Sequence, residues 1–176
     1  MSGRVLVAGI GNVFLGDDGF GVETVRRLAE PGHEMPEHVE VVDIGVRGVH
    51  LAYQLLDGYD TLVLVDATAR GGPPGTLYLI EPAEPGSLAP QGPALDGHQM
   101  SPDAVLALLD TLCAGTGTSP PRQIRVVGCE PDCLEEGIGL SAPVAAAVPE
   151  AVRMVLDLVR RPDGEPLDQE RNATAN

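Results

Sequence analysis

Residues 4–29, RVLVAGIGNVFLGDDGFGVETVRRLA, contain a strand, a glycine-rich turn and a helix in succession. Residues 4–9 form a short apolar run that ends in glycine, which is typical of a buried strand. After the turn, apolar side chains recur at helical spacing up to the break at Pro31-Gly32. These side chains are Val22, Val25, Leu28 and Ala29. A strand that passes directly into a helix is the building unit of an α/β fold.

Two further strands follow this unit. HVEVVD at 38–43 predicts the second strand, residues 49–57 predict a second helix, and TLVLV at 61–65, followed by Asp66, predicts the third strand. Successive strand, helix, strand units require right-handed crossovers. The first three strands are therefore expected to be parallel, in the order 2-1-3.

The next strand, at 76–80, is expected to run antiparallel. Residues 67–75 separate it from the third strand, and a parallel return needs about a dozen residues or more. Residues 82–97 are rich in Pro, Gly and Ala and predict a loop of unusual length, which ends at His98. Loops of this length are usually functional or disordered.

A helix, a strand and a helix complete the chain. Ser101-Pro102-Asp103 is a helix start, with a capping residue, a proline in the first turn and an acid near the positive end of the dipole. Residues 123–128 predict the fifth strand. Residues 141–160 predict the last helix, which Pro149 is expected to kink.

Length and composition indicate a single domain. The chain has 176 residues, of which 43% are hydrophobic and only 3% aromatic, so its core must be aliphatic. This bias is common in parallel sheets that are covered on both faces. We expect one α/β domain over residues 1–161 and a disordered polar tail over residues 162–176.

The net charge and the cysteine content indicate which binding partners and which cellular compartment to expect. The net charge of −15 argues against binding to nucleic acid or to an anionic membrane, since both would be repelled. No apolar run approaches the ~20 residues of a membrane-spanning helix, and the first residues lead into a strand instead of a signal peptide. Three cysteines without a disulfide spacing pattern fit a reducing compartment. We therefore expect a cytoplasmic protein, and a monomer is the default expectation because the sequence does not indicate the oligomeric state.

Asp18, Asp66 and His98 are the candidate site residues. Each lies beyond an apolar, strand-like run or at the end of the long loop, and an open α/β sheet binds its ligands outside the carboxyl ends of its strands. Two carboxylates and one imidazole suit a divalent metal ion. With only three such groups, coordination positions would stay open, and part of the metal's coordination would come from another molecule.

Two other interpretations compete with a metal-assisted peptidase. A dinucleotide site would use Gly9-x-Gly11, but the third glycine of the fingerprint is replaced by Phe14, and Asp17-Asp18 would meet the pyrophosphate with like charge. A purely structural interpretation makes Asp17 or Asp18 a helix cap. The peptidase interpretation itself lacks a His-Glu-x-x-His helix, a Gly-x-Ser-x-Gly elbow and a cysteine beside a credible base.

The sequence resembles the maturation endopeptidases of nickel-iron hydrogenases along nearly the whole folded chain. The matching blocks are Gly9-Ile10-Gly11-Asn12 through Asp18 and Gly21, Val42-Asp43, Leu64-Val65-Asp66-Ala67, Pro74-Gly75-Thr76, His98-Gln99 and Gly137-Ile138-Gly139-Leu140-Ser141. The first block and the His-Gln block are the specific ones. The resemblance implies a three-layer sandwich, with a twisted five-stranded sheet of order 2-1-3-5-4, one antiparallel edge strand and helices on both faces.

The resemblance also implies an activity. It is a single endoproteolytic cut that removes the C-terminal extension of a hydrogenase large-subunit precursor, in a class of enzymes usually grouped with aspartic-type endopeptidases. Asp18, Asp66 and His98 map onto the nickel ligands of the family and are our candidate catalytic residues. The nickel is expected to come with the precursor, and we expect that zinc or cadmium can replace it. A nickel-delivery or sensing module without proteolysis stays open as an alternative.

One segment departs from the family pattern. Many members have two adjacent glycines after the aspartate of the second strand, whereas this chain has Asp43-Ile44-Gly45. Gly45 still permits a tight turn. The departure leaves open which backbone groups line the peptide-binding cleft.

Overall fold

The computed structural model describes residues 3–81 and 102–160, which form one five-stranded sheet in the order β2-β1-β3-β5-β4. The strands are β1 (Val5–Ile10), β2 (Val39–Gly45), β3 (Thr61–Ala67), β4 (Leu77–Ile80) and β5 (Gln123–Cys129). β2, β1, β3 and β5 are parallel, and β4 pairs with β5 antiparallel at one edge. The predicted order and the antiparallel edge strand are confirmed.

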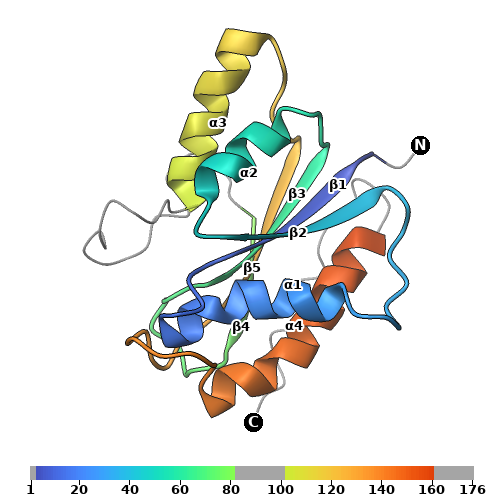
Figure 1. The fold of residues 1–176 in the computed structure, drawn as a ribbon. Helices are drawn as coiled ribbons and strands as arrows, with labels where there is room; N and C mark the ends of the chain where they lie inside the picture. The colour runs from blue at the N-terminus through green and yellow to red at the C-terminus, as the bar shows by residue number, and fades with distance from the viewer. Residues whose placement is uncertain (1–2, 82–101, 161–176) are drawn as a thin grey trace.

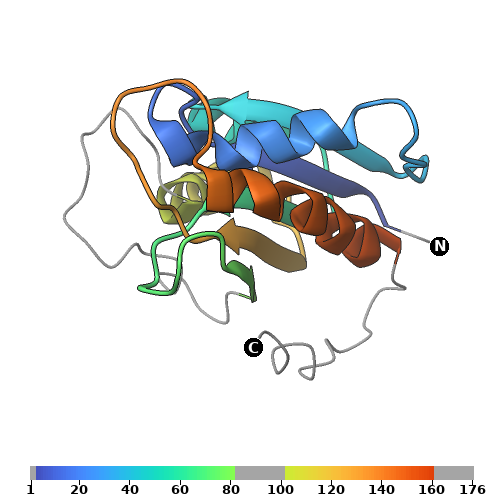
Figure 2. The same ribbon diagram turned by 90° about the horizontal axis from the view of Figure 1, so that it is seen from below.

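Four helices cover the two faces of this sheet, and a 3₁₀ turn precedes the first. The helices are α1 (Phe20–Leu28), α2 (Gly48–Leu55), α3 (Pro102–Thr116) and α4 (Ala142–Arg160), and the 3₁₀ turn is η1 (Gly16–Gly19). α1 and α4 lie together on one face, and α2 and α3 lie on the other (Figures 1 and 2). The result is the expected three-layer sandwich.

The two apolar cores follow from the alternation of side chains along the central strands. In β1, Val5 and Val7 pack with α1 and α4, whereas Leu6 and Ala8 pack with α2 and α3. Successive side chains of a strand point to opposite faces, so a strand that is covered on both faces must be apolar throughout. The unbroken run of aliphatic residues in β1 is therefore a direct requirement of the sandwich.

α4 shows the predicted helical periodicity. Its valines at positions 144, 148, 152, 155 and 159 are all buried against the sheet and α1. Pro149 lies inside the helix, which continues through it to Arg160. The kink expected at Pro149 remains a prediction.

The departure from the family pattern at Asp43-Ile44-Gly45 is a β-bulge. Gly9 pairs with Asp43 and Ile10 pairs with Gly45, so Ile44 is the extra residue between them. Its side chain is buried in the core below α2 and α3. Gly45 has a φ of +58°, a left-handed conformation that favours glycine. Strand β2 thus extends two residues beyond its predicted end.

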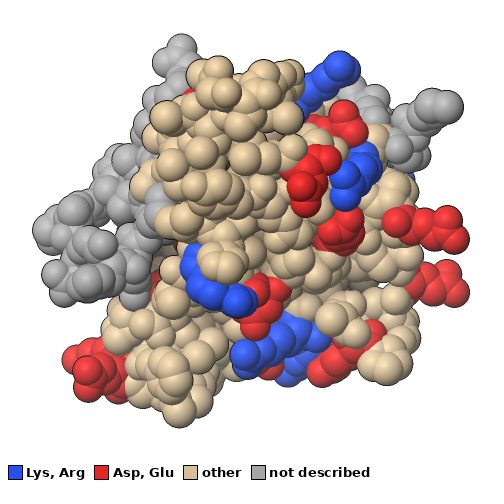
Figure 3. All heavy atoms as spheres, turned by 45° about the horizontal axis from the view of Figure 1, so that its top comes forward, with Lys and Arg blue, Asp and Glu red and all other residues tan. Residues whose placement is uncertain are grey.

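Acidic residues outnumber basic ones in this protein, and the two kinds of side chain lie close together on its surface. The chain has 11 basic and 26 acidic residues, and on the face drawn in Figure 3 basic side chains lie next to acidic ones. Among the described residues, ion pairs join Arg4 to Glu40, Arg26 to Asp43, Arg27 to Glu23, Arg125 to Glu81 and Arg153 to Glu150. All of these pairs except Arg125–Glu81 are exposed on both sides, and exposed pairs contribute little to stability. Within the two described segments, no helix has the length and apolar character needed to cross a membrane.

The loop predicted at 82–97, His98, Ser101 and the tail predicted at 162–176 lie outside the described residues. The single domain over residues 1–161 and the tail over residues 162–176 therefore stay predictions.

Two glycines let α1 lie directly on the strands. A Cβ on Gly21 would overlap the carbonyl oxygens of Val65 and Ile10, and a Cβ on Gly9 would overlap the carbonyl oxygen of Gly21. Both positions are thus occupied by backbone from the neighbouring element. This close approach sets the position of η1, which immediately precedes α1 in the chain.

We expect Gly21→Ala to destabilise the protein by about 1 to 3 kcal/mol, because the methyl group has no space and backbone must move. Urea unfolding followed by circular dichroism measures this change. The result is informative because alanine normally stabilises a helix interior relative to glycine by about 1 kcal/mol.

Gly115→Ala in α3 is the matched control. Its Cβ would meet nothing within 4 Å, so the variant should gain about 0.5 to 1 kcal/mol. Equal effects of the two substitutions would show that close packing of α1 does not limit position 21.

Candidate active site

Asp18 and Asp66 meet at the carboxyl edge of the sheet. Asp66 lies inside β3, one residue before its end, and not after the strand as predicted from sequence. Asp18 lies in η1, and both side chains are partly buried. Burial raises the pKa of Asp66 well above its ordinary value, and the negative charge of Asp18 raises it further. The structure therefore brings together two of the three predicted site residues.

The third predicted residue, His98, lies outside the described residues. It precedes Pro102, the first residue of α3, by four positions. α3 leads into the parallel strand β5, so it runs antiparallel to that strand and begins at the carboxyl edge of the sheet (Figure 1). In the described part of the chain, no group of three or more His, Cys, Asp and Glu side chains is arranged to hold a metal ion. A three-residue site at this edge thus depends on His98.

Asp18 is positioned by the glycine turn. The backbone N–H of Asn12 donates to Asp18 Oδ2 at 2.8 Å, and the Asn12 side chain in turn accepts from the N–H of Phe14 at 2.9 Å. Gly11 has a φ of +137°, and a Cβ there would overlap the carbonyl oxygen of Asp18. Burial raises the pKa of Asp18, and the hydrogen bond from Asn12 offsets part of that effect.

Asp17 has a different environment from its neighbour. Its side chain is completely buried and accepts four hydrogen bonds. The donors are the backbone N–H groups of Asp132 (2.8 Å), Cys133 (2.9 Å) and Ser141 (2.7 Å) and the hydroxyl of Ser141 (2.8 Å). Burial alone would raise the pKa of Asp17, but these hydrogen bonds outweigh it and lower the pKa.

Sequence reasoning missed the role of Asp17, because two adjacent aspartates in a glycine turn do not reveal which one faces inward. Helix capping was the structural interpretation of the pair. No side chain caps α1, whose N-cap is Gly19. Asp17 instead joins η1 to the loop between β5 and α4.

The cysteines do not take part in this site. All three are free thiols, with Cys113 and Cys129 buried and Cys133 exposed. Burial raises the pKa of Cys129 to about 12, helped by the charge of Asp17. A thiol with this pKa stays protonated at neutral pH, which makes it a poor nucleophile and a poor metal ligand.

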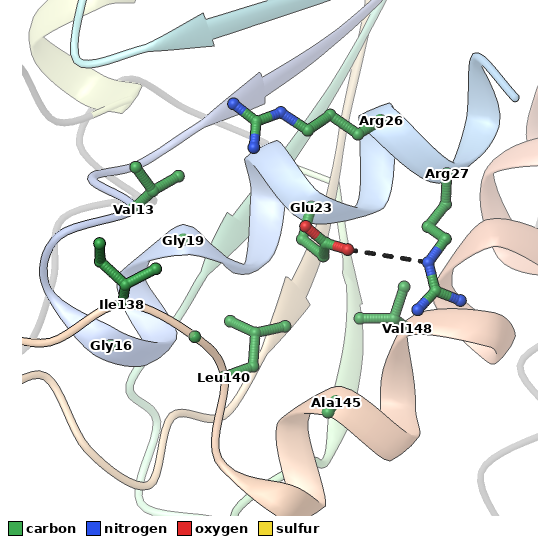
Figure 4. A pocket seen from close by; sticks show the side chains of 11 residues that line it. Val13, Gly16, Gly19, Glu23, Arg26, Arg27, Ile138, Leu140, Ala145 and Val148 are labelled. Carbon is green, nitrogen blue, oxygen red and sulfur yellow. Dashed lines mark ion pairs between the residues drawn. The ribbon is translucent and has the colours of Figure 1, made fainter.

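A separate hollow lies beside η1, between α1 and α4 (Figure 4). It has a volume of about 280 Å³, and the ion pair between Glu23 and Arg27, 3.7 Å apart, lies at its rim. Its apolar lining consists of Val13, Ile138, Leu140, Ala145 and Val148. Neither Asp18 nor Asp66 lines it, so the hollow is distinct from the carboxylate pair.

Comparison with known proteins identifies the family. Residues 22–158 match the family model described as hydrogenase maturation protease. The hydrogenase 2 maturation protease of Escherichia coli K12 is 33% identical over 169 residues, which cover 95% of this chain and 97% of that protein. The chain belongs to the hydrogenase maturation protease family. The hydrogenase expression/formation protein HoxM of Cupriavidus necator is 37% identical over 165 residues, covering 93% of this chain and 77% of that protein.

Solved structures agree with this assignment to the hydrogenase maturation proteases. The hydrogenase maturating endopeptidase HybD of E. coli superposes with a TM-score of 0.69 at 34% identity, over 89% of this chain and 92% of that chain. The solution structure of an E. coli endopeptidase gives a TM-score of 0.72 at 31% identity, with the same coverage.

Family membership decides between the interpretations drawn from sequence. The chain is a hydrolase of the hydrogenase maturation proteases, which supports the peptidase interpretation over the dinucleotide-binding alternative and the module without proteolysis. The segment matched by the family model begins at Val22, so it includes Asp66 and His98 but not Asp18. The assignment of Asp18 therefore depends on the geometry described above.

The raised pKa of Asp66 predicts a stability effect in metal-free protein. A carboxyl group with a raised pKa in the folded state stabilises the fold only while it is protonated, and this contribution is lost as the pH rises through the raised pKa. At neutral pH, Asp66→Asn should therefore stabilise the protein, because the amide brings no charge into this buried position beside Asp18. The gain should vanish as the pH falls toward about 4. Urea titrations at several pH values measure it.

Asp17→Asn is the control, because it should change the stability of the protein in the opposite direction. The pKa of Asp17 is lowered, so its contribution is present above the ordinary carboxyl pKa and is lost as the pH falls. The variant should lose about 2 kcal/mol at neutral pH and less in acid. If both variants shift stability in the same direction, the contrast between the two aspartates is wrong.

Proposed function

We propose that this protein removes the C-terminal extension from the precursor of a nickel-iron hydrogenase large subunit after nickel insertion. Asp18, Asp66 and His98 bind the nickel that the precursor carries. The observation that supports this proposal is the juxtaposition of Asp18 and Asp66 at the carboxyl edge, where the charge of Asp18 disfavours the ionised state of Asp66 and burial disfavours the ionised state of both. A bound divalent cation would reverse that penalty.

The donor set fits such an ion. Carboxylate oxygens and an imidazole nitrogen bind nickel, zinc and cadmium, and both carboxylates are partly exposed. The nickel is part of the substrate, so three protein ligands are enough to recognise it. It can polarise the scissile carbonyl or lower the pKa of a bound water to about 7, or a carboxylate of the pair can act as general base.

The loops on either side of η1 carry exposed apolar side chains that suit contact with a protein substrate. Phe14 and Ile138 are 62% and 82% exposed, and a hydrogen bond of 2.9 Å from the N–H of Gly16 to the carbonyl of Gly137 joins their two loops. Exposed apolar surface is typical of a region that binds another protein. We place this reaction in the cytoplasm, with a monomer of the protease as the working unit.

Single substitutions of the three residues test the site. Asp18→Asn, Asp66→Asn and His98→Ala should each reduce cleavage of nickel-loaded precursor by about 100-fold or more, because each removes a ligand worth several kcal/mol. Mass spectrometry of the precursor, which detects the shortened product, measures the rate. Wild-type rates for both aspartate variants would reject the proposed site and leave the family assignment intact.

Nickel dependence tests the recognition step. Cleavage should require nickel inside the precursor, because an ion held there brings its own ligands and is presented at high effective concentration. Free nickel added to the protease should not replace it. Rapid cleavage of a folded, nickel-free precursor would contradict recognition through the metal, and would assign Asp18, Asp66 and His98 to direct acid–base chemistry.

A further inference from the structure

Asp17 connects the candidate catalytic turn with both ends of the loop between β5 and α4. The loop begins after Cys129, and Asp17 Oδ2 accepts the N–H groups of Asp132 and Cys133 near its start. At its end, Ser141, which directly precedes α4, donates its N–H to Oδ1 and its hydroxyl to Oδ2. One buried carboxylate thus closes the loop and fastens it to η1.

Backbone hydrogen bonds also join η1 and the residue Phe14 before it to the β5–α4 loop. The N–H of Asp17 donates to the carbonyl of Cys133 at 2.9 Å, and the N–H of Gly137 donates to the carbonyl of Phe14 at 2.8 Å. Gly16 has a φ of +55°, and a Cβ at this position would lie only 2.7 Å from the carbonyl oxygen of Cys133, so no larger residue fits. The turn and the loop therefore form one hydrogen-bonded unit.

Asp18 follows Asp17 in this unit and faces the other way. Its carboxylate accepts the N–H of Asn12 from the glycine turn, whereas the carboxylate of Asp17 faces the loop. A shift of η1 toward or away from the loop would displace Asp18 relative to Asp66, which is held within β3. A misplacement of about 1 Å in an active site can reduce the rate by about 100-fold.

We propose that Asp17 is a positioning residue of the protease, whose hydrogen bonds to the β5–α4 loop hold Asp18 at the correct distance from Asp66. The inference rests on the proposed role of Asp18. The same hydrogen bonds tie the loop that carries the exposed Ile138 to the turn that carries Asp18.

Glu130 provides a matched control. It is also a buried carboxylate, and it accepts hydrogen bonds from the N–H groups of Arg70 (2.7 Å) and Gly71 (3.1 Å) and from the hydroxyl of Tyr78 (2.9 Å). Glu130 is itself the first residue of the β5–α4 loop, but its donors belong to the segment after β3 and to β4, and none lies in η1. Glu130→Gln therefore weakens a comparable buried network without touching the turn that carries Asp18.

The test compares cleavage of nickel-loaded precursor by wild type, Asp17→Asn and Glu130→Gln at a temperature where circular dichroism shows all three folded. Asp17→Asn should lower kcat by about tenfold or more, whereas Glu130→Gln should stay within about twofold of wild type. Equal kcat values for the two variants would overturn the inference. If those two kcat values are equal but Asp18→Asn is inactive in the same assay, only the inference about Asp17 fails and the proposed function stands.

Ser141→Ala keeps the inference testable if Asp17→Asn does not fold, because it removes only one of the four hydrogen bonds. NMR amide exchange is the readout, and the N–H of Asn12 reports on Asp18 directly. If Asp17 positions Asp18, Ser141→Ala should speed exchange at Asn12 by about threefold or more, as well as at Cys133. Faster exchange at Cys133 with no change at Asn12 would show a purely structural role for Asp17 and overturn the inference.

Discussion

The constraint on which this protein depends is that two carboxylates are held together at one edge of a sheet against their own repulsion. β1 and β3 are adjacent and parallel, so their carboxyl ends lie side by side, and η1 returns Asp18 to that edge beside Asp66. Burial and the neighbouring charge both penalise the ionised state of Asp66. The rest of the fold must supply the free energy that this arrangement costs.

The compensation comes from contacts immediately around the turn. The backbone of α1 packs directly on the strands at Gly9 and Gly21, and Asp17 fastens η1 to the β5–α4 loop. Asp17 and Asp18 are identical in chemistry and adjacent in sequence, yet their pKa values shift in opposite directions. The number of hydrogen-bond donors around each carboxylate causes this difference. The satisfied carboxylate suits anchoring, and the less satisfied one retains capacity to bind a cation.

Much of the fold could be predicted from local patterns. The handedness of the crossovers predicted the parallel order 2-1-3. The short connection after Asp66 predicted that the next strand runs antiparallel. The position of β5 between β3 and β4 was predicted only from the family resemblance. The bulge at Ile44 and the burial of Asp17 could not be predicted. Both depend on partners far away in the chain, and no local spacing encodes which of two adjacent side chains meets a loop more than a hundred residues later.

The electrostatics of the turn explain why the nucleotide-binding interpretation fails on a strand, turn, helix unit that otherwise suits it. In dinucleotide-binding folds the first helix begins at the glycine turn, and its free N–H groups and dipole bind a phosphate. Here η1 is interposed between β1 and α1, and it places two aspartates where the anion would lie. Asp17 is held by donors from another segment, so the side chain left facing the edge is the carboxylate of Asp18. One additional turn with two acids thus makes this edge of the sheet electrostatically unfavourable for the anion that a dinucleotide site would bind there.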